Sequence, residues 1–294
     1  MTALPVFRRT LAESWRSLIG WGLGVVAALA DLLPPVTRWA GASAGAFMCL
    51  AHVSGRRELA YAAILEAAVR DRGVFEPRRL LRGERPFPHG EQVRGFLEIV
   101  LAGDGFARVR SGSPVHILMS CVDGARGVWP RVAVALASMH RRGVTGRVHG
   151  PARPVAGLRA RVVCSHDAAD PGELRDWVLM SGAVPPVMPV LRQTGTRYFD
   201  GALIDNAPVR ALPDAARGGR VLVILSSPYP VPARPRPLPG GGQALYLAPR
   251  GPLPITNLDC AAPEKVIAAR ALGERDGRSF RGRVAAFLAS STDP

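Results

Sequence analysis

Gly41-Ala42-Ser43-Ala44-Gly45 is the stretch that decides the fold. It follows an apolar run that ends at Trp39-Ala40 and precedes a helix-like run from Phe47 to Ala51. A Gly-x-Ser-x-Gly pattern between a strand and a helix is typical of a nucleophile elbow, in which the serine stands on a tight turn. The first N–H groups of the helix, beginning at Ala44, would then point at an oxyanion formed beside Ser43. The pattern alone has low specificity in a chain rich in alanine and glycine.

Composition limits the classes of function. The 294 residues suit one large domain or two small ones, and a hydrophobic content of 48% is ample for a core. The net charge of +15 comes almost entirely from arginines, with Lys265 the only lysine. These arginines are scattered, without the dense basic run of a nucleic-acid surface. The positive charge suits anionic lipid headgroups as well as it suits nucleic acid. We therefore expect contact with lipid or a membrane surface and no binding of nucleic acid.

The four cysteines, Cys49, Cys121, Cys164 and Cys260, lie far apart in apolar runs. No pair has the spacing of metal ligands, which favours buried thiols in a reducing compartment and no metal site. We expect a protein that is cytoplasmic or peripheral at the membrane.

The N-terminal region allows two interpretations. Residues 1–17 contain three arginines, and an apolar run from Leu18 to Ala30 follows them, which resembles a secretory signal. At about 13 residues the run is too short to span a bilayer. Cleavage after Ala30 would leave only a short strand before the Ser43 turn, so we favour a buried strand, a glycine turn and a buried helix. Secretion remains the alternative.

Gly20-Trp21-Gly22-Leu23-Gly24 lies inside this run. A glycine-rich turn between a strand and a helix lets backbone N–H groups approach an anion, either a phosphate or a developing oxyanion. The spacing does not match a dinucleotide fingerprint. The segment is therefore a candidate oxyanion loop, with a plain glycine turn as the alternative.

Short β-compatible runs alternate with helical patterns along the rest of the chain. This alternation predicts an α/β fold with a largely parallel sheet. The strands expected are Val115–Cys121, Arg161–Ser165, Val221–Leu225 and Ala244–Leu247; the helices include Arg56–Arg70, Glu91–Leu101 and one or two within Pro263–Ala289; residues 72–90 and 141–161 are arginine-rich and loop-like.

A serine nucleophile needs a base, and the histidines are poorly placed to supply one. None follows His166, whereas the Ser, Asp/Glu, His order of α/β-hydrolases puts the histidine near the C-terminus. A triad of Ser43 and His166 with Asp104 or Asp123 is the histidine-based alternative. Asp200 ends a short apolar strand and precedes Gly201-Ala202, so its carboxylate could serve as the base; a plain Asx turn is the other interpretation.

These motifs resemble those of the patatin-like phospholipases, a family of Ser–Asp dyad lipid acyl hydrolases. Gly41 to Gly45 matches the family's G-x-S-x-G, and Asp200-Gly201-Ala202 matches its D-G-[GA]. Ser181 to Pro185 resembles the segment that precedes that aspartate, and Leu253–Ile255 with Ala271–Gly277 resembles the tail of bacterial members. The likeness spans about residues 18 to 280.

The resemblance implies a three-layer α/β/α fold, with a single patatin-like domain over residues 18–290 after an N-terminal extension, residues 1–17. It implies Ser43 as nucleophile, Asp200 as general base, a lipid or phospholipid substrate, and neither metal nor organic cofactor. Gly20, Gly22, Leu23 and Gly24 would form the oxyanion loop together with the Ala44 N–H. That loop departs from the family pattern in two ways. The glycine segment is one residue shorter, and Leu23 stands where a basic residue is common. A lipid-binding or scaffold protein with weak or absent catalysis is therefore the second hypothesis.

Overall fold

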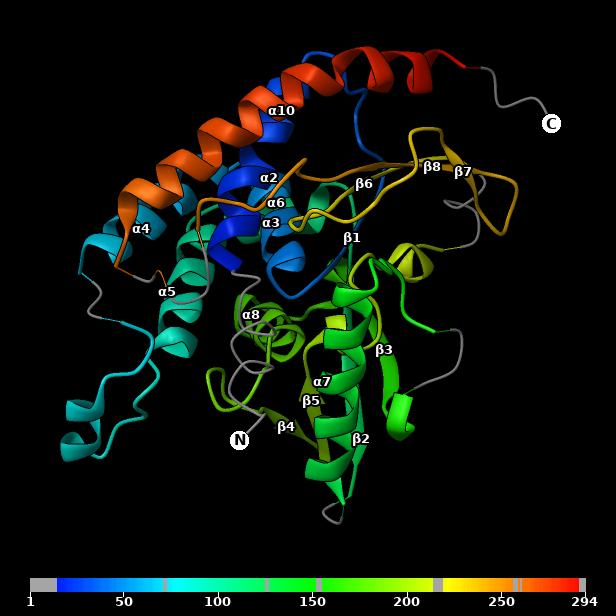
Figure 1. Cartoon of the computed structure of the whole chain (residues 1–294). Helices are drawn as coiled ribbons and strands as arrows, with labels where there is room; N and C mark the ends of the chain where they lie inside the picture. The colour runs from blue at the N-terminus through cyan, green and yellow to red at the C-terminus, as the bar shows by residue number, and fades with distance from the viewer. Residues whose placement is uncertain are drawn as a thin grey trace.

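The computed structural model describes residues 15–70, 73–124, 127–151, 155–213, 219–255, 259 and 261–290 (Figure 1). Most of the predicted N-terminal extension, residues 1–14, and Cys260 lie outside the described residues. The helices are α2 (Trp15–Leu29), α3 (Ala44–Val53), α4 (Arg57–Arg70), α5 (His89–Leu101), α6 (Gly105–Ser111), α7 (Val128–Val144), α8 (Pro171–Ser181) and α10 (Pro263–Ala289). The strands are β1 (Trp39–Ala42), β2 (Val115–Asp123), β3 (Arg159–Cys164), β4 (Arg192–Gln193), β5 (Thr196–Phe199), β6 (Arg220–Ile224), β7 (Arg236–Pro237) and β8 (Gln243–Leu247). Short 3₁₀ turns are η1 (Pro77–Arg82), η2 (Val155–Gly157), η3 (Ser165–Asp167), η4 (Gly201–Leu203) and η5 (Val209–Ala211).

The strands form two mixed sheets. In the first, β2 pairs with β1 in parallel and with β3 and β5 antiparallel, and β4 extends from β5. In the second, β8 pairs with β6 in parallel and with β7 antiparallel. The sequence predicted a largely parallel sheet, whereas among the described residues only β1–β2 and β6–β8 pair in parallel and the sheets are mixed. The antiparallel β3 carries exposed Arg159 and Arg161, unlike the continuous apolar run of a strand buried on both faces.

The first sheet has helices on both faces, which gives three layers. Because strand residues alternate between faces, Val115, Ile117, Met119 and Cys121 of β2 pack in one core with α3, α4, α5 and α8. Val122 of β2 and Phe199 of β5 pack instead against α7. The fold is therefore α/β with a three-layer arrangement.

The second sheet packs under two long helices. Leu245 and Leu247 of β8 join α2 and α10 in one core, and Ala244 and Tyr246 face a separate one. Helix α10 runs over α2 along the top of the molecule (Figure 1). The expected C-terminal helical region is thus one continuous helix from Pro263 to Ala289.

The glycine segment is not a turn. Gly20, Trp21, Gly22, Leu23 and Gly24 all lie inside α2, so the predicted strand and glycine turn are wrong, although the predicted burial is confirmed for residues 19–25 and for Leu29. The glycines serve helix packing: a Cβ on Gly24 would lie 2.2 Å from the carbonyl oxygen of Arg270, and one on Gly273 would lie 2.1 Å from that of Trp21. Close approach of α2 and α10 explains the absence of side chains here.

This packing makes a testable prediction for stability. We expect Gly24→Ala to lower the free energy of unfolding by about 1–3 kcal/mol, because the added methyl group must push α10 away. Gly282→Ala, in the facing helix α10, is the control: a Cβ there meets nothing within 4 Å. It should stabilise by about 1 kcal/mol through helix propensity. Urea unfolding of both variants measures the effect, and equal midpoints would contradict the packing role.

Candidate active site

Ser43 stands between β1 and α3 in a strained conformation. Its φ of 53° and ψ of −127° are unusual for a residue with a side chain. The carbonyl of Ser43 accepts the first helical hydrogen bonds, from the N–H groups of Ala46 and Phe47. A Cβ on Gly41 would lie 2.5 Å from the Ala46 nitrogen, which explains the glycine at this position. The predicted strand–turn–helix context of the motif is confirmed.

Pairing with β2 explains why Ser43 and Asp200 meet. Strand β1 runs parallel to β2 and ends with Ala42 opposite Leu118, so the next residue, Ser43, reaches the level of Met119. Strand β5 runs antiparallel and ends with Phe199 opposite Ser120, so Asp200 reaches the same level from the other direction. Since β3 occupies His116 to Cys121 of β2 on one edge, β1 and β5 share the other edge. Two ladders on one strand therefore bring the two side chains together.

A serine that the sequence analysis did not single out fixes the turn. The Ser181 hydroxyl accepts a hydrogen bond from the Ser43 N–H at 2.8 Å and donates one to the carbonyl of Leu118 at 2.6 Å. Ser181 ends α8 and is completely buried. Its place before a glycine- and proline-rich segment is the only signal in the sequence that could have indicated this role.

The backbone around Asp200 is held equally closely. Its N–H donates to the carbonyl of Ala183 at 3.0 Å, and its carbonyl accepts from the Ser120 hydroxyl at 3.0 Å. A Cβ on Gly201 would lie 2.1 Å from the Leu118 carbonyl oxygen, so the residue after Asp200 must be glycine for this approach. Ser120 also went unnoticed in the sequence, although a polar residue within a buried apolar strand is an indication of such a hydrogen bond.

The electrostatics of Asp200 suit a proton acceptor. The side chain is only 6% exposed, and burial raises the pKa of its carboxyl to about 6. Hydrogen bonds from the Ala202 N–H, at 2.7 Å, and from the Ser43 hydroxyl favour the ionised form and oppose the rise in pKa. The predicted Asx turn and the serine contact thus coexist, because one oxygen caps η4 while the carboxylate also reaches Ser43.

A cavity of about 690 Å³ opens at these two side chains. Strand β1 and residues 219–226, which include β6, line it along their whole lengths, and Gly41, Ala44, Gly45 and Ala202 belong to its wall. Most of the other lining side chains are apolar: Val26, Leu33, Val36, Val74, Met139, Val184, Val187, Met188, Val209, Leu212 and Leu288. A mainly apolar cavity beside a hydroxyl and a carboxylate suits a ligand with a hydrocarbon chain.

The predicted oxyanion donors separate into two groups. Gly20, Gly22, Leu23 and Gly24 are not among the residues that line the cavity, and the interior of α2 employs their N–H groups in helical hydrogen bonds. This part of the prediction is wrong. Ala44 and Gly45 line the cavity at the start of α3, where N–H groups have no partner within the helix. Ala44 therefore stays a candidate donor.

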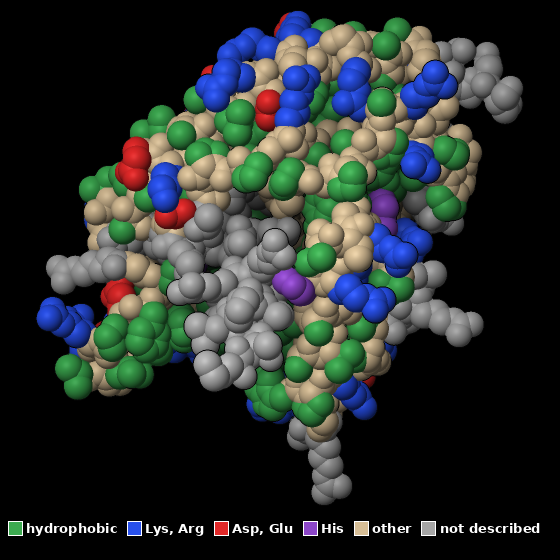
Figure 2. Space-filling model, viewed as in Figure 1, with side chains coloured by type: hydrophobic (Ala, Val, Ile, Leu, Met, Phe, Trp, Pro, Cys, Tyr) green, Lys and Arg blue, Asp and Glu red, His purple; other side chains and the backbone are tan. Residues whose placement is uncertain are grey.

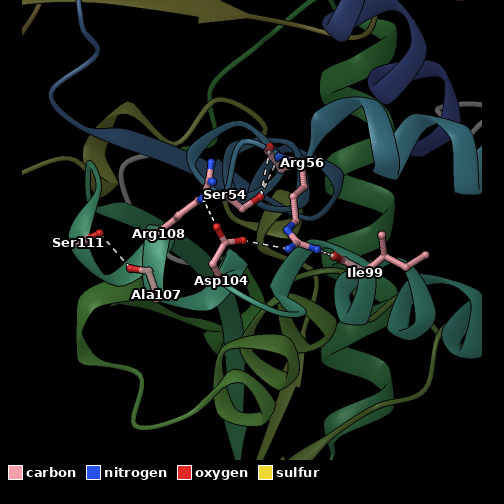
Figure 3. Close-up of polar contacts among 8 residues, drawn as sticks. Ser54, Arg56, Ile99, Asp104, Ala107, Arg108 and Ser111 are labelled. Atoms are coloured by element: carbon pink, nitrogen blue, oxygen red, sulfur yellow. Dashed lines mark hydrogen bonds and ion pairs between the residues drawn. The ribbon is translucent and has the colours of Figure 1, made fainter.

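The histidine-based alternative finds no support among the described residues. His166 bonds through Nε2 to the Gly112 carbonyl at 2.9 Å. Asp104 forms ion pairs with Arg56 and Arg108, at 3.0 and 2.7 Å, on an exposed surface (Figure 3). Asp123 pairs with Arg159, and none of these groups lines the cavity. His89 is the one histidine that does, at the start of α5.

The cysteines and the acidic side chains of the described residues do not gather into a metal site. No group of three or more histidine, cysteine or acidic side chains that could hold a metal occurs among the described residues. Cys49 and Cys121 are buried free thiols, as expected, whereas Cys164 is partly exposed. No described helix is both long enough and apolar enough to cross a bilayer.

Comparison with known protein families adds one finding. The family model described as patatin-like phospholipase matches residues 17–213, which include both the Ser43 and the Asp200 motifs. The C-terminal segments that resemble bacterial members lie beyond the matched residues. No curated protein matches the chain.

Proposed function

Because the chain belongs to the patatin-like phospholipase family, we propose that it hydrolyses lipid acyl esters with Ser43 as nucleophile and Asp200 as general base. The family match supports lipid acyl hydrolysis in general. The dyad rests on one observation: the side chains of Ser43 and the buried Asp200 interact at the wall of an apolar cavity, and this interaction favours the ionised carboxylate. This contact supplies the base that a serine hydroxyl needs.

In the first step, Ser43 Oγ attacks the ester carbonyl carbon and its proton passes to the Asp200 carboxylate. The carbonyl oxygen becomes an oxyanion, for which the Ala44 N–H and the positive end of α3 are the candidate stabilising groups. Collapse of the tetrahedral intermediate breaks the bond to the alcohol, which leaves with the proton from Asp200. The acyl group stays on Ser43.

In the second step, Asp200 accepts a proton from water as the water oxygen attacks the acyl-enzyme. The bond to Ser43 then breaks, the serine recovers its proton from Asp200, and the fatty acid leaves. The same carboxylate therefore acts twice, and no step needs a metal. The acyl chain would lie along the apolar side chains between β1 and β6.

Covalent labelling tests the proposal directly. We expect a fluorophosphonate probe to modify Ser43, because the strained turn exposes its hydroxyl to the cavity and Asp200 activates it. Peptide mapping by mass spectrometry would locate the modification. Labelling of another serine, or none at probe concentrations that label a reference serine hydrolase, would contradict the assignment.

A lipid-binding protein without turnover is the second candidate. The observation that favours it is the position of the predicted oxyanion loop within α2, which leaves Ala44 as the one predicted donor at the cavity among the described residues. Loss of one oxyanion donor typically costs about 10²–10³ in rate. Binding of a fatty acid in the cavity with no labelling of Ser43 would identify this function.

A further inference from the structure

A short projection, residues 73–89, carries η1 at its tip (Figure 1, cyan). Hydrophobic side chains gather on the same projection, with basic side chains beside them (Figure 2). Leu81 is 88% exposed, Leu80 57% and Phe75 53%. Large apolar side chains at such exposure, close together, mark a surface that meets a partner rather than water.

The charges of this projection are mainly positive, with Arg78, Arg79, Arg82 and Arg85 against Glu76 and Glu84. Arg78 and Arg82, which lie within two residues of the leucine pair in the sequence, are exposed, and neither forms an ion pair with any described residue. The acidic side chains Glu84 and Glu91 are both paired with Arg79, at 3.1 and 2.5 Å. Apolar side chains with unpaired arginines beside them are complementary to a bilayer with anionic headgroups.

Hydrogen bonds within the projection and to the neighbouring residue Pro186 hold it in place. Besides its ion pairs, Arg79 donates to the carbonyl of Arg85 at 2.8 Å, and the Glu76 N–H donates to the carbonyl of Pro86 at 2.8 Å. The Arg85 guanidinium donates to the carbonyl of Pro186 at 2.7 Å. These bonds hold the leucines outward without requiring the loop to order when it binds, which lowers the entropic cost of binding.

The same projection adjoins the candidate active site. Val74 and His89, near its two ends, line the cavity, and Pro186 lies between the cavity residues Val184 and Val187. A bilayer in contact with Leu80 and Leu81 would therefore approach the wall of the cavity from the side of α5. The projection is thus joined at both ends to residues that line the cavity.

We propose that residues 75–82 seat the protein on an anionic lipid bilayer, with Leu80 and Leu81 entering the headgroup region and Arg78 and Arg82 bound to phosphates. The proposal rests on the proposed function, since it identifies the substrate as lipid presented at a membrane surface. It does not require turnover, and binding is therefore measured apart from activity.

The experiment measures cosedimentation with vesicles of phosphatidylcholine alone or mixed with phosphatidylglycerol at 7:3, in a Ser43→Ala background. We expect binding to the mixed vesicles, weakened by salt. Leu80→Asp with Leu81→Asp should lower the partition coefficient at least tenfold, as should Arg78→Gln with Arg82→Gln, each arginine contributing about fivefold. Leu80→Ser with Leu81→Ser repeats the test without adding charge.

Matched controls come from α10. Ile267 is 53% exposed, and Arg275 and Arg278 are exposed, so Ile267→Asp and Arg275→Gln with Arg278→Gln should leave vesicle binding unchanged. Unchanged binding of the projection variants, equal loss in the controls, or a change of oligomeric state in the leucine variants would overturn the proposal. Hydrolysis of a water-soluble short-chain ester separates the two proposals: its absence in the wild type, with vesicle binding intact, contradicts only the proposed function.

Discussion

Replacing Ser43 by alanine is expected to lower kcat/KM for a fatty-acyl ester by about 10⁴-fold or more, because no other group can form the acyl-enzyme. The change removes one oxygen from a side chain whose backbone is held by Ser181, so the fold should survive. Initial rates with a chromogenic ester of medium chain length, measured at pH 8, give the value. Circular dichroism checks that the variant is folded.

Ser111→Ala is the control for this experiment. Its exposed hydroxyl donates to the Ala107 carbonyl within α6 (Figure 3), and its loss should leave kcat/KM unchanged. Equal, measurable activity of Ser43→Ala and the wild type would remove Ser43 from the mechanism, whereas no activity in either would favour the lipid-binding function.

Replacing Asp200 by asparagine should have the second largest effect, a loss of about 10²–10⁴-fold in kcat/KM, since the amide cannot accept the proton of Ser43. The pH dependence of kcat/KM in the wild type also tests the role of Asp200 as base. The base must be ionised, and the pKa of Asp200 is raised to about 6, so kcat/KM should fall below about pH 6 and level off above it. Asp167→Asn, at an exposed turn, should change neither rate nor profile.

Asp200→Asn should also stabilise the fold at high pH. The pKa of Asp200 is raised from 3.8 to about 6, so the native state binds its proton more tightly than the unfolded state does. Stability therefore falls as pH rises from about 4 to 6, and above pH 6 ionisation in the buried site costs on the order of 2–3 kcal/mol. Asp200→Asn should recover most of this at pH 8 and nothing below pH 4. Urea unfolding at pH 8 and below pH 4 measures the free energy of unfolding of both proteins. A variant that is less stable than the wild type at pH 8 would show that burial does not destabilise the ionised carboxylate.

The two chemical motifs could be predicted from the sequence because each carries its reason locally. Gly41 permits the contact with α3, and Gly201 permits the contact with β2, so the glycines next to Ser43 and Asp200 are readable as constraints on the backbone. Such a motif can be recognised in the sequence even when the segment that packs against it is not known.

The glycine segment misled for the opposite reason. Gly20 and Gly24 look like turn residues, yet the reason for them lies on α10, far along the chain, where Gly273 meets the Trp21 carbonyl. A sequence pattern shows that a side chain is missing but not which neighbour excludes it. Ser181 was overlooked for a similar cause, because its two hydrogen-bond partners belong to different elements.

Alignment of β1 and β5 end to end on β2 has a consequence for insertions and deletions. The separation of the hydroxyl and the carboxylate depends on which residues of β2 each strand pairs with, and not on the lengths of the connecting segments. Lengthening the exposed turn after β2, near Gly124, should therefore be harmless to chemistry. A single residue inserted between Leu118 and Ser120 would move the two groups apart by about 3.3 Å, one strand step, and end their contact.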